Sequence, residues 1–215
     1  EILKINKDKI EVIHLGINDK YLSPNEKNNF IKNFDYSQKY ILSVLSCVRY
    51  HNIIKLLKAF KIFINEKNIE IKFVLVLQVL DKEYFIEIEN YIKNNFKNNE
   101  IILFNNIQSE YLLSLYRKAQ LYLFSSYCEV FGLTSLEAMS QGCPVLISKN
   151  SALPEINSDA CIYFNPDNEN EIKDKIYKIL NDSNLKNDLI NKGFFHVRNF
   201  TWKNNLKKSL SIIEK

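Results

Sequence analysis

Apolar residues in this chain are grouped in short continuous runs, and the segments between the runs have the spacing of amphipathic helices. Six runs are predicted to be strands: 40–48, 71–78, 100–105, 121–126, 144–148 and 160–164. Most of them are apolar at every position rather than at alternate ones, as expected of strands covered on both faces. The pattern predicts an α/β fold: a Rossmann-like open parallel sheet with helices on both faces.

The helical segments differ in how clearly the sequence marks them. The clearest is 52–67, where one face carries Ile53, Leu56, Leu57, Phe60 and Ile64. A further helix is predicted to begin at Ser109, whose hydroxyl would cap it. Residues 168–213 predict two or three closing helices, with a break near Gly193 and with Trp202 anchoring the last helix.

The first 39 residues do not follow this alternation. The run KIEVIHLGI (9–17) is predicted to be a strand with no helix before it, and the segment after it is polar and irregular. A strand without its own domain suggests that a preceding part is missing. We therefore divide the chain into 1–39, an incoming strand and interdomain linker remnant, and 40–215, one domain with C-terminal helices.

Composition narrows the function classes. The net charge of +4 is spread along the chain without a basic block, which argues against a nucleic-acid partner. The longest apolar runs fall short of a membrane-spanning helix, and the charged start lacks a signal-peptide core. The four cysteines, Cys47, Cys128, Cys143 and Cys161, have no CxxC spacing. Three of them sit in or beside apolar runs, so buried, reduced thiols in a cytoplasmic protein are expected.

The stretch 129–156, EVFGLTSLEAMSQGCPVLISKNSALPEI, contains two of the chain's four glycines. A helix beginning near Leu133 and Thr134 would point free N–H groups, and the positive end of its dipole, into the preceding loop. Gly132 would let a ligand approach the backbone closely. Because ligands collect beyond the carboxyl ends of parallel strands, this loop is a candidate phosphate-binding site.

Two carboxylates flank that helix start. Glu129 precedes it, and Glu137 follows Leu133 by one turn, close to the face that carries the predicted core residues Leu133, Leu136 and Met139. Carboxylates accept hydrogen bonds from paired hydroxyls, so the pair would suit a diphosphate with a hydroxyl-rich group at each end, as in a nucleotide sugar. The alternative is that Glu129 only stabilises the helix N-terminus and that Glu137 faces solvent or pairs with a lysine.

The motif EVFGLTSLEAMSQGCPVLIS, followed by SALPEI and DA, resembles the donor signature of retaining glycosyltransferases of family 4, which have the two-domain GT-B fold. The resemblance covers nearly the whole chain, as the C-terminal half of such an enzyme. It implies that Glu137 holds the ribose, Glu129 the donor sugar, and the backbone of Phe131, Gly132, Leu133 and Thr134 the sugar and diphosphate. It also implies that Arg49 neutralises the leaving diphosphate, the alternative being an ordinary surface arginine.

The chain departs from the family pattern at two places. His51-Asn52 stands where the family has a lysine, so that either the leaving group is neutralised less strongly or His51 serves when protonated. The family's glycine-rich turn after the second strand is Gln78-Val79-Leu80, and the base is expected near Asn106 and Ile107. The resemblance implies no cofactor and no metal, and no cluster with metal-ligand spacing contradicts this.

The implied reaction is transfer of a sugar, with retention, from an NDP-sugar (GDP-mannose or a UDP-hexose) to a glycan or lipid-linked acceptor in surface polysaccharide synthesis. The partner would be the missing N-terminal acceptor domain, without which this fragment is expected to be inactive. That half would also allow peripheral contact with the inner face of the membrane. Two alternatives remain: a non-catalytic nucleotide-sugar-binding module, and another GT-B enzyme such as an epimerase or phosphorylase.

Overall fold

The computed structural model describes residues 6, 9–23, 29–67, 69–97 and 99–214. Its centre is a six-stranded sheet in the order β3-β2-β1-β4-β5-β6, and every neighbouring pair is parallel. The strands are β1 (Tyr40–Cys47), β2 (Lys72–Val79), β3 (Ile101–Asn105), β4 (Leu121–Phe124), β5 (Val145–Ser148) and β6 (Ile162–Phe164). The predicted open parallel sheet is confirmed, and its strand order is that of a doubly wound dinucleotide-binding fold.

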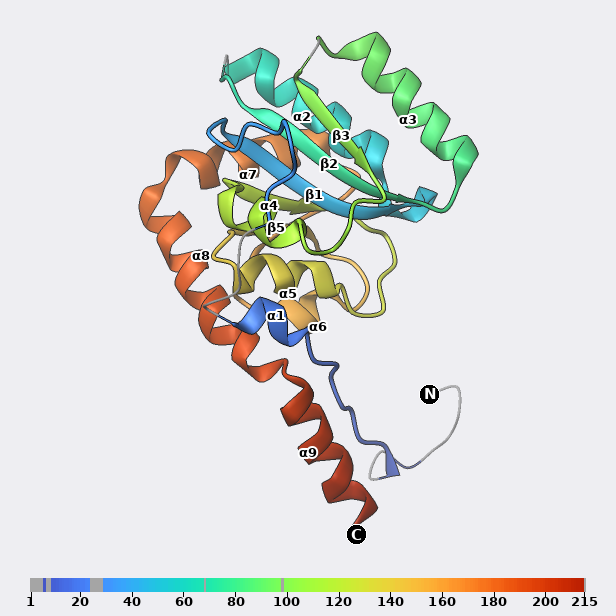
Figure 1. Cartoon of the computed structure of the whole chain (residues 1–215), viewed down its shortest axis with the longest axis vertical. Coiled ribbons are helices and arrows are strands. Elements are labelled where there is room, and N and C mark those ends of the chain that lie inside the picture. The colour runs from blue at the N-terminus through green and yellow to red at the C-terminus, as the bar shows by residue number, and fades with distance from the viewer. Residues whose placement is uncertain (1–5, 7–8, 24–28, 68, 98, 215) are drawn as a thin grey trace.

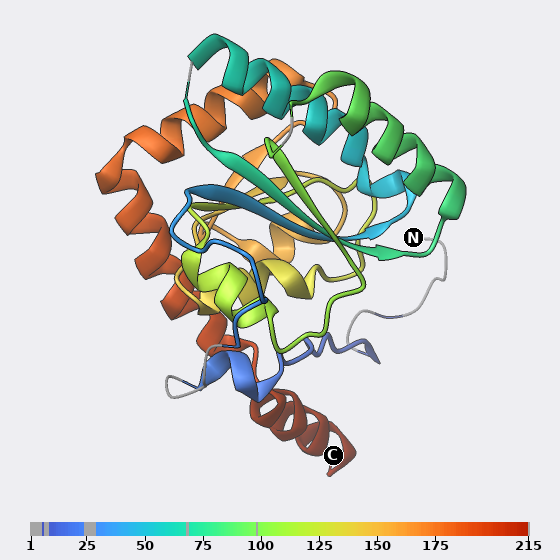
Figure 2. The ribbon, with the colours of Figure 1, turned by 45° about the horizontal axis from the view of Figure 1, so that its top comes forward.

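Helices cover both faces of this sheet (Figures 1 and 2). On one face α2 (Ile53–Lys67) packs against both α3 (Lys82–Asn95) and α7 (Glu169–Asn181). On the other face α5 (Leu133–Ser140) contacts α1 (Asp19–Leu22), α4 (Leu112–Lys118) and α8 (Ser183–His196). The short α6 (Leu153–Asn157) connects β5 to β6, and α9 (Trp202–Ile213) ends the described chain.

The core is built from the runs that predicted the strands. All four residues of β4 and all four of β5 are buried, as are most of β1 and β2. From α2, the predicted residues Ile53, Leu56, Leu57 and Phe60 are fully buried, while Ile64 is only half-buried. The apolar strands and the apolar faces of the helices therefore pack together on both sides of the sheet.

The predicted start of the helix before β4 was wrong. The helix expected to begin at Ser109 begins at Leu112, its N-cap is Tyr111 and no side chain caps it, because the Ser109 hydroxyl accepts a hydrogen bond from Lys20 Nζ at 2.9 Å. The cysteines agree with the expectation: Cys47, Cys143 and Cys161 are buried, Cys128 is exposed, and all four are free thiols.

The segment before β1 is not the expected strand. Residues 10–16 have no regular secondary structure, and only Ile17 forms a bridge, parallel to Thr201. Gly16 lies so close to the start of α9 that a Cβ would stand 2.2 Å from the Trp202 backbone nitrogen. The segment is thus held against the C-terminal region rather than in a sheet. Of the predicted linker remnant 1–39, residues 1–5, 7–8 and 24–28 lie outside the described residues.

The closing helices follow the prediction in number but not in detail. The described part of 168–213 contains α7, α8 and α9, as expected. Gly193 lies inside α8, where its missing side chain admits Met139 of α5, and the break comes later, at 197–201. Trp202 does not anchor α9, since it is 48% exposed and no residue of that helix is buried.

Candidate functional site

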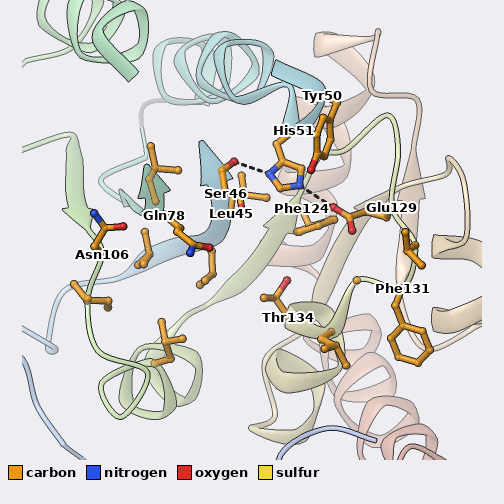
Figure 3. A pocket seen from close by; sticks show the side chains of 18 residues that line it. Leu45, Ser46, Tyr50, His51, Gln78, Asn106, Phe124, Glu129, Phe131 and Thr134 are labelled. Carbon is orange, nitrogen blue, oxygen red and sulfur yellow. Dashed lines mark hydrogen bonds and ion pairs between the residues drawn. The ribbon is translucent and has the colours of Figure 1, made fainter. Parts of the chain in front are cut away.

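A cavity of about 660 Å³ opens at the carboxyl ends of the central strands. Its wall includes the ends of β1 and β2, the loop after β3 and the loop between β4 and α5 (Figure 3). Here β1 lies between β2 and β4, so the strand order reverses in the middle of the sheet. Ligands of open α/β sheets bind at such a switch point.

The start of α5 forms the middle of the cavity wall. Gly132 is its N-cap, with φ +82° and no side-chain hydrogen bond to the first turn, so side chains leave these N–H groups uncapped. A Cβ at Gly132 would stand 2.6 Å from Leu153 Cδ2, so both the backbone angle and the space require glycine. The helix end therefore offers N–H donors and a positive dipole end to an anion in the cavity.

Two side chains at this helix start have defined positions. Thr134 lines the cavity, and its hydroxyl oxygen accepts a hydrogen bond from the Tyr122 hydroxyl at 2.8 Å. Leu133 was predicted to belong to the core with Leu136 and Met139, but it is 36% exposed and lines the cavity instead. The wall beside the helix end is therefore partly apolar.

One end of the cavity carries a histidine and a carboxylate in contact. His51 lies in the 3-10 turn after β1 (Arg49–His51), which ends at Asn52 in the left-handed region. Its Nδ1 is 2.6 Å from the Ser46 carbonyl oxygen, and its Nε2 is 2.8 Å from Glu129 Oε1. The side chains of His51 and Glu129 are 7% and 18% exposed. Both predicted residues thus reach one end of the site, as Figure 3 shows.

The other end of the cavity carries amides and apolar side chains. Gln78 is the exposed residue that follows the buried part of β2, and Asn106 and Ile107 follow β3. The Asn106 side-chain oxygen accepts a hydrogen bond from the Val79 N–H at 3.2 Å. The backbone N–H of Asn106 donates to the Leu77 carbonyl oxygen at 2.8 Å. These bonds hold the two loops together at this end of the cavity, whose wall also contains Ile107 and Leu112.

Phe131 lines the cavity and also contacts aromatic rings from the first and the last parts of the chain. Its ring makes edge contacts with His14, at 6.0 Å between centroids, and with Phe200, at 5.9 Å. His14 also stacks on Phe200, at 5.6 Å, and its Nε2 lies 3.1 Å from Glu155 Oε1. The loop that carries Glu129 is therefore supported by the segment before α1 and by the start of the C-terminal region.

The structure does not bring Arg49 into the cavity. Its guanidinium donates two hydrogen bonds to the Glu87 carboxylate of α3, at 2.7 and 3.0 Å, and lies over the Tyr84 ring. The Glu87 carboxylate raises the pKa of Arg49, and the pKa of Glu87 is lowered in return. Ser46, at the end of β1, lines the cavity instead. The expected position of Arg49 beside a diphosphate is therefore not met.

Glu137 also departs from the prediction, because it is not among the residues that line the cavity. It accepts a hydrogen bond from the Tyr116 hydroxyl at 3.1 Å. Burial raises the pKa of Glu137 to about 7, although the hydroxyls of Tyr116 and Tyr21 and the charge of Lys20 oppose the rise. Its buried carboxyl is thus satisfied within the protein, and the two glutamates do not share one crevice.

The lining residues include seven of the nine predicted site residues: His51, Ile107, Glu129, Phe131, Gly132, Leu133 and Thr134. The sequence analysis did not predict Ser46, Tyr50 and Phe124 as parts of the wall. It named Gln78 only as part of the segment that stands in place of the family's glycine-rich turn. Ser46 and Gln78 could have been found from the rule that residues at the carboxyl ends of parallel strands face the ligand.

The described residues hold no cluster of three or more histidine, cysteine, aspartate or glutamate side chains that could bind a metal ion. Nor does any helix in the described ranges have the length and apolar character needed to cross a membrane.

Comparison with known proteins identifies the family. Residues 24–194 match the family described as "Glycosyl transferases group 1". The O-antigen chain mannosyltransferase B of Escherichia coli is 34% identical over 98 residues, which cover 46% of this chain and 26% of that protein. The O-antigen chain mannosyltransferase RfbU of Salmonella typhimurium is 23% identical over 81% of this chain and 45% of that protein.

Solved structures show the same fold. A glycosyltransferase from Rickettsia africae has a TM-score of 0.84 at 21% identity, over 97% of this chain and 57% of that one. The sucrose-phosphate synthase of Thermosynechococcus elongatus has a TM-score of 0.78 at 22% identity, over 95% of this chain and 52% of that one. The chain thus spans about half of each solved protein, and from a quarter to about half of the two mannosyltransferases. It belongs to the glycosyl transferases group 1 family and has the fold of one GT-B domain.

Proposed function

We propose that this chain is the donor-binding domain of a retaining glycosyltransferase of family 4, which takes a sugar from an NDP-sugar. The single observation that carries the proposal is the uncapped start of α5 in the middle of a cavity whose two ends carry different kinds of side chain. Glu129 at one end suits sugar hydroxyls, the helix end suits a diphosphate, and the amides and apolar side chains near Asn106 suit a base.

The donor is proposed to be GDP-mannose or a UDP-hexose, used in surface polysaccharide synthesis. The mannosyltransferase and O-antigen names of two relatives support the choice of mannose and of this pathway class. Transfer is proposed to need a second domain with the acceptor site, because the chain spans about half of its solved relatives. We propose that transfer needs no metal or cofactor. We also propose that the enzyme acts in the cytoplasm and that any contact with the membrane is made by the second domain.

The direct test is calorimetric titration of this chain with UDP, GDP, UDP-glucose and GDP-mannose. One nucleotide class should bind, and its sugar-bearing form should bind more tightly than the bare diphosphate. The Glu129→Gln variant should lose most of that preference, since a hydrogen bond to a charged group contributes about 1.5–3 kcal/mol. Glu89→Gln is the matched control, because it replaces an exposed carboxylate of α3 that does not line the cavity. The absence of binding to any of the four ligands would refute the proposal.

The retaining mechanism needs the full-length protein. Proton NMR of the first product should show the same anomeric configuration as in the donor. An inverted anomer would refute the retaining part of the proposal while leaving donor binding intact.

A further inference from the structure

Gln78 is a polar residue at the end of a buried strand, and it lines the cavity. In the parallel register of the sheet it lies beside Ser46, two residues further along than the apolar pair Val44 and Val76. Because every second side chain of a strand lies on the same face, these four side chains share one face of the sheet. That face is apolar where the strands are buried and polar at their carboxyl ends.

The backbone on both sides of Gln78 is held by one residue, Asn106. The carbonyl oxygen of Leu77 accepts from the Asn106 backbone N–H at 2.8 Å. On the other side, the Val79 N–H donates to Asn106 Oδ1 at 3.2 Å. The strand end that carries Gln78 is therefore fixed within the protein before any ligand binds.

The side-chain amide of Gln78 is free to bind a ligand. Gln78 is exposed, and no other group of the described residues forms a hydrogen bond with its amide. Figure 3 shows this side chain on the cavity wall between Ser46 and Asn106. An amide has two N–H donors and one acceptor oxygen in one plane, so it can form paired hydrogen bonds with a group that has a donor next to an acceptor.

The place of Gln78 in the sheet indicates which part of a ligand it contacts. Its strand, β2, lies two places from β4, which leads to the start of α5. Neighbouring strands are ~4.8 Å apart, so the ends of β2 and β4 are about 10 Å apart. An anion at the helix start and a group at Gln78 therefore belong to different parts of one ligand. Ile107 and Leu112, at the same end of the cavity as Gln78, suit an apolar ring.

We propose that Gln78 selects the nucleobase of the donor by hydrogen bonding to the polar edge of the base, while Ile107 and Leu112 contact its ring. This inference rests on the proposed function, and it names the residue that distinguishes one nucleotide class from another. The bases differ in the pattern of donors and acceptors along their polar edges. An amide held in one place pairs with one of these patterns and leaves groups unpaired with the others.

The test measures base preference rather than affinity alone. UDP, GDP, CDP and ADP are titrated by calorimetry into the wild type, Gln78→Met, Gln78→Glu and Asn94→Leu. The wild type should favour one base by about tenfold or more. Gln78→Met keeps the length of the side chain without its amide, so it should bind the favoured nucleotide about tenfold more weakly and lose most of the preference. Asn94→Leu removes an exposed amide of α3 that does not line the cavity and should match the wild type.

The Gln78→Glu variant gives a second readout with a defined direction. A carboxylate can only accept hydrogen bonds. Guanine has two neighbouring donors, its ring N–H and its amino group, whereas the ring N–H of uracil lies between two carbonyl oxygens. The ratio of GDP affinity to UDP affinity should therefore rise about tenfold or more in Gln78→Glu relative to the wild type. The added negative charge weakens both diphosphates alike and cancels in this ratio.

The outcomes separate this proposal from the proposed function. If the wild type binds none of the four nucleotides, the proposed function fails. If the wild type binds them without a base preference, or if Gln78→Met keeps the preference or weakens all four equally, the role of Gln78 is refuted and donor binding stands. An unchanged ratio in Gln78→Glu would refute that role as well. Far-UV circular dichroism of each variant confirms that the fold is kept.

Discussion

The buried carboxyl of Glu137 makes the stability of this domain depend on pH. Glu137 lies in α5, accepts a hydrogen bond from the Tyr116 hydroxyl, and has its pKa raised to about 7, chiefly by burial. In the unfolded chain the pKa of a glutamate is near its ordinary value of 4.5. The folded protein therefore holds a proton on this side chain over a pH range in which the unfolded chain has released it.

The sign and size of the effect follow from proton linkage. Because the folded state binds more protons, the free energy of unfolding falls as the pH rises from about 4.5 to about 7, and the loss is complete above that range. A shift of the pKa from the ordinary 4.5 to about 7 corresponds to at most about 3.4 kcal/mol. Glu137→Gln removes this titration while it keeps an oxygen that can accept from Tyr116. It should therefore be more stable than the wild type at pH 8, and the advantage should shrink toward pH 5.

The assay is urea denaturation followed by far-UV circular dichroism at several pH values from about 5 to 8. The quantity of interest is the free energy of unfolding of Glu137→Gln minus that of the wild type, since other groups titrate equally in both proteins. Glu110→Gln is the control, because it replaces an exposed carboxylate near α4. A difference between Glu137→Gln and the wild type that does not change with pH, or that matches the control, would refute the reasoning.

Three further predictions concern stability, each measured by urea denaturation. Gly132→Ala should lose about 1–3 kcal/mol, because its φ of +82° is strained for a side chain and the Cβ would meet Leu153; a loss below about 0.5 kcal/mol would contradict this. Asp81→Ala should lose about 1 kcal/mol, because its carboxylate accepts from the Tyr84 N–H at 2.9 Å and caps α3; Asp81→Asn should keep most of the stability. Phe60→Ala should lose about 3–5 kcal/mol, because the ring is fully buried; a smaller loss would mean that the core closes around the missing ring.

Much of the fold could be predicted because its signals are local. Continuous apolar runs indicated strands covered on both faces, and a helix connects each strand from β1 to β5 to the next strand in the chain. The start of α5 could be placed because Gly132 marks it, and residues 129–134 line one cavity because they form one short loop and helix turn. Backbone conformation over a few residues depends mainly on those residues.

The direction of individual side chains could not be predicted in the same way. Arg49 and His51 are two residues apart in a 3-10 turn with about three residues per turn, so they point to different sides. Only the position of Glu87 on α3 and of Glu129 after β4 decides which of the two faces the cavity. The sequence suggested both residues, and the folded chain places only His51 in the cavity wall.

Glu137 shows the same limit. Its place on a helix next to the candidate site followed from the sequence, and the cost of burying a carboxylate without a partner followed from general chemistry. Its partners come from Tyr21 and Tyr116, which lie far from it along the chain and meet it only when α1 and α4 pack on α5. The sequence by itself determined the elements, their order and the motif at the helix start. Tertiary packing decided which charged groups face the cavity, because a side chain's partners lie on elements brought together from distant parts of the chain.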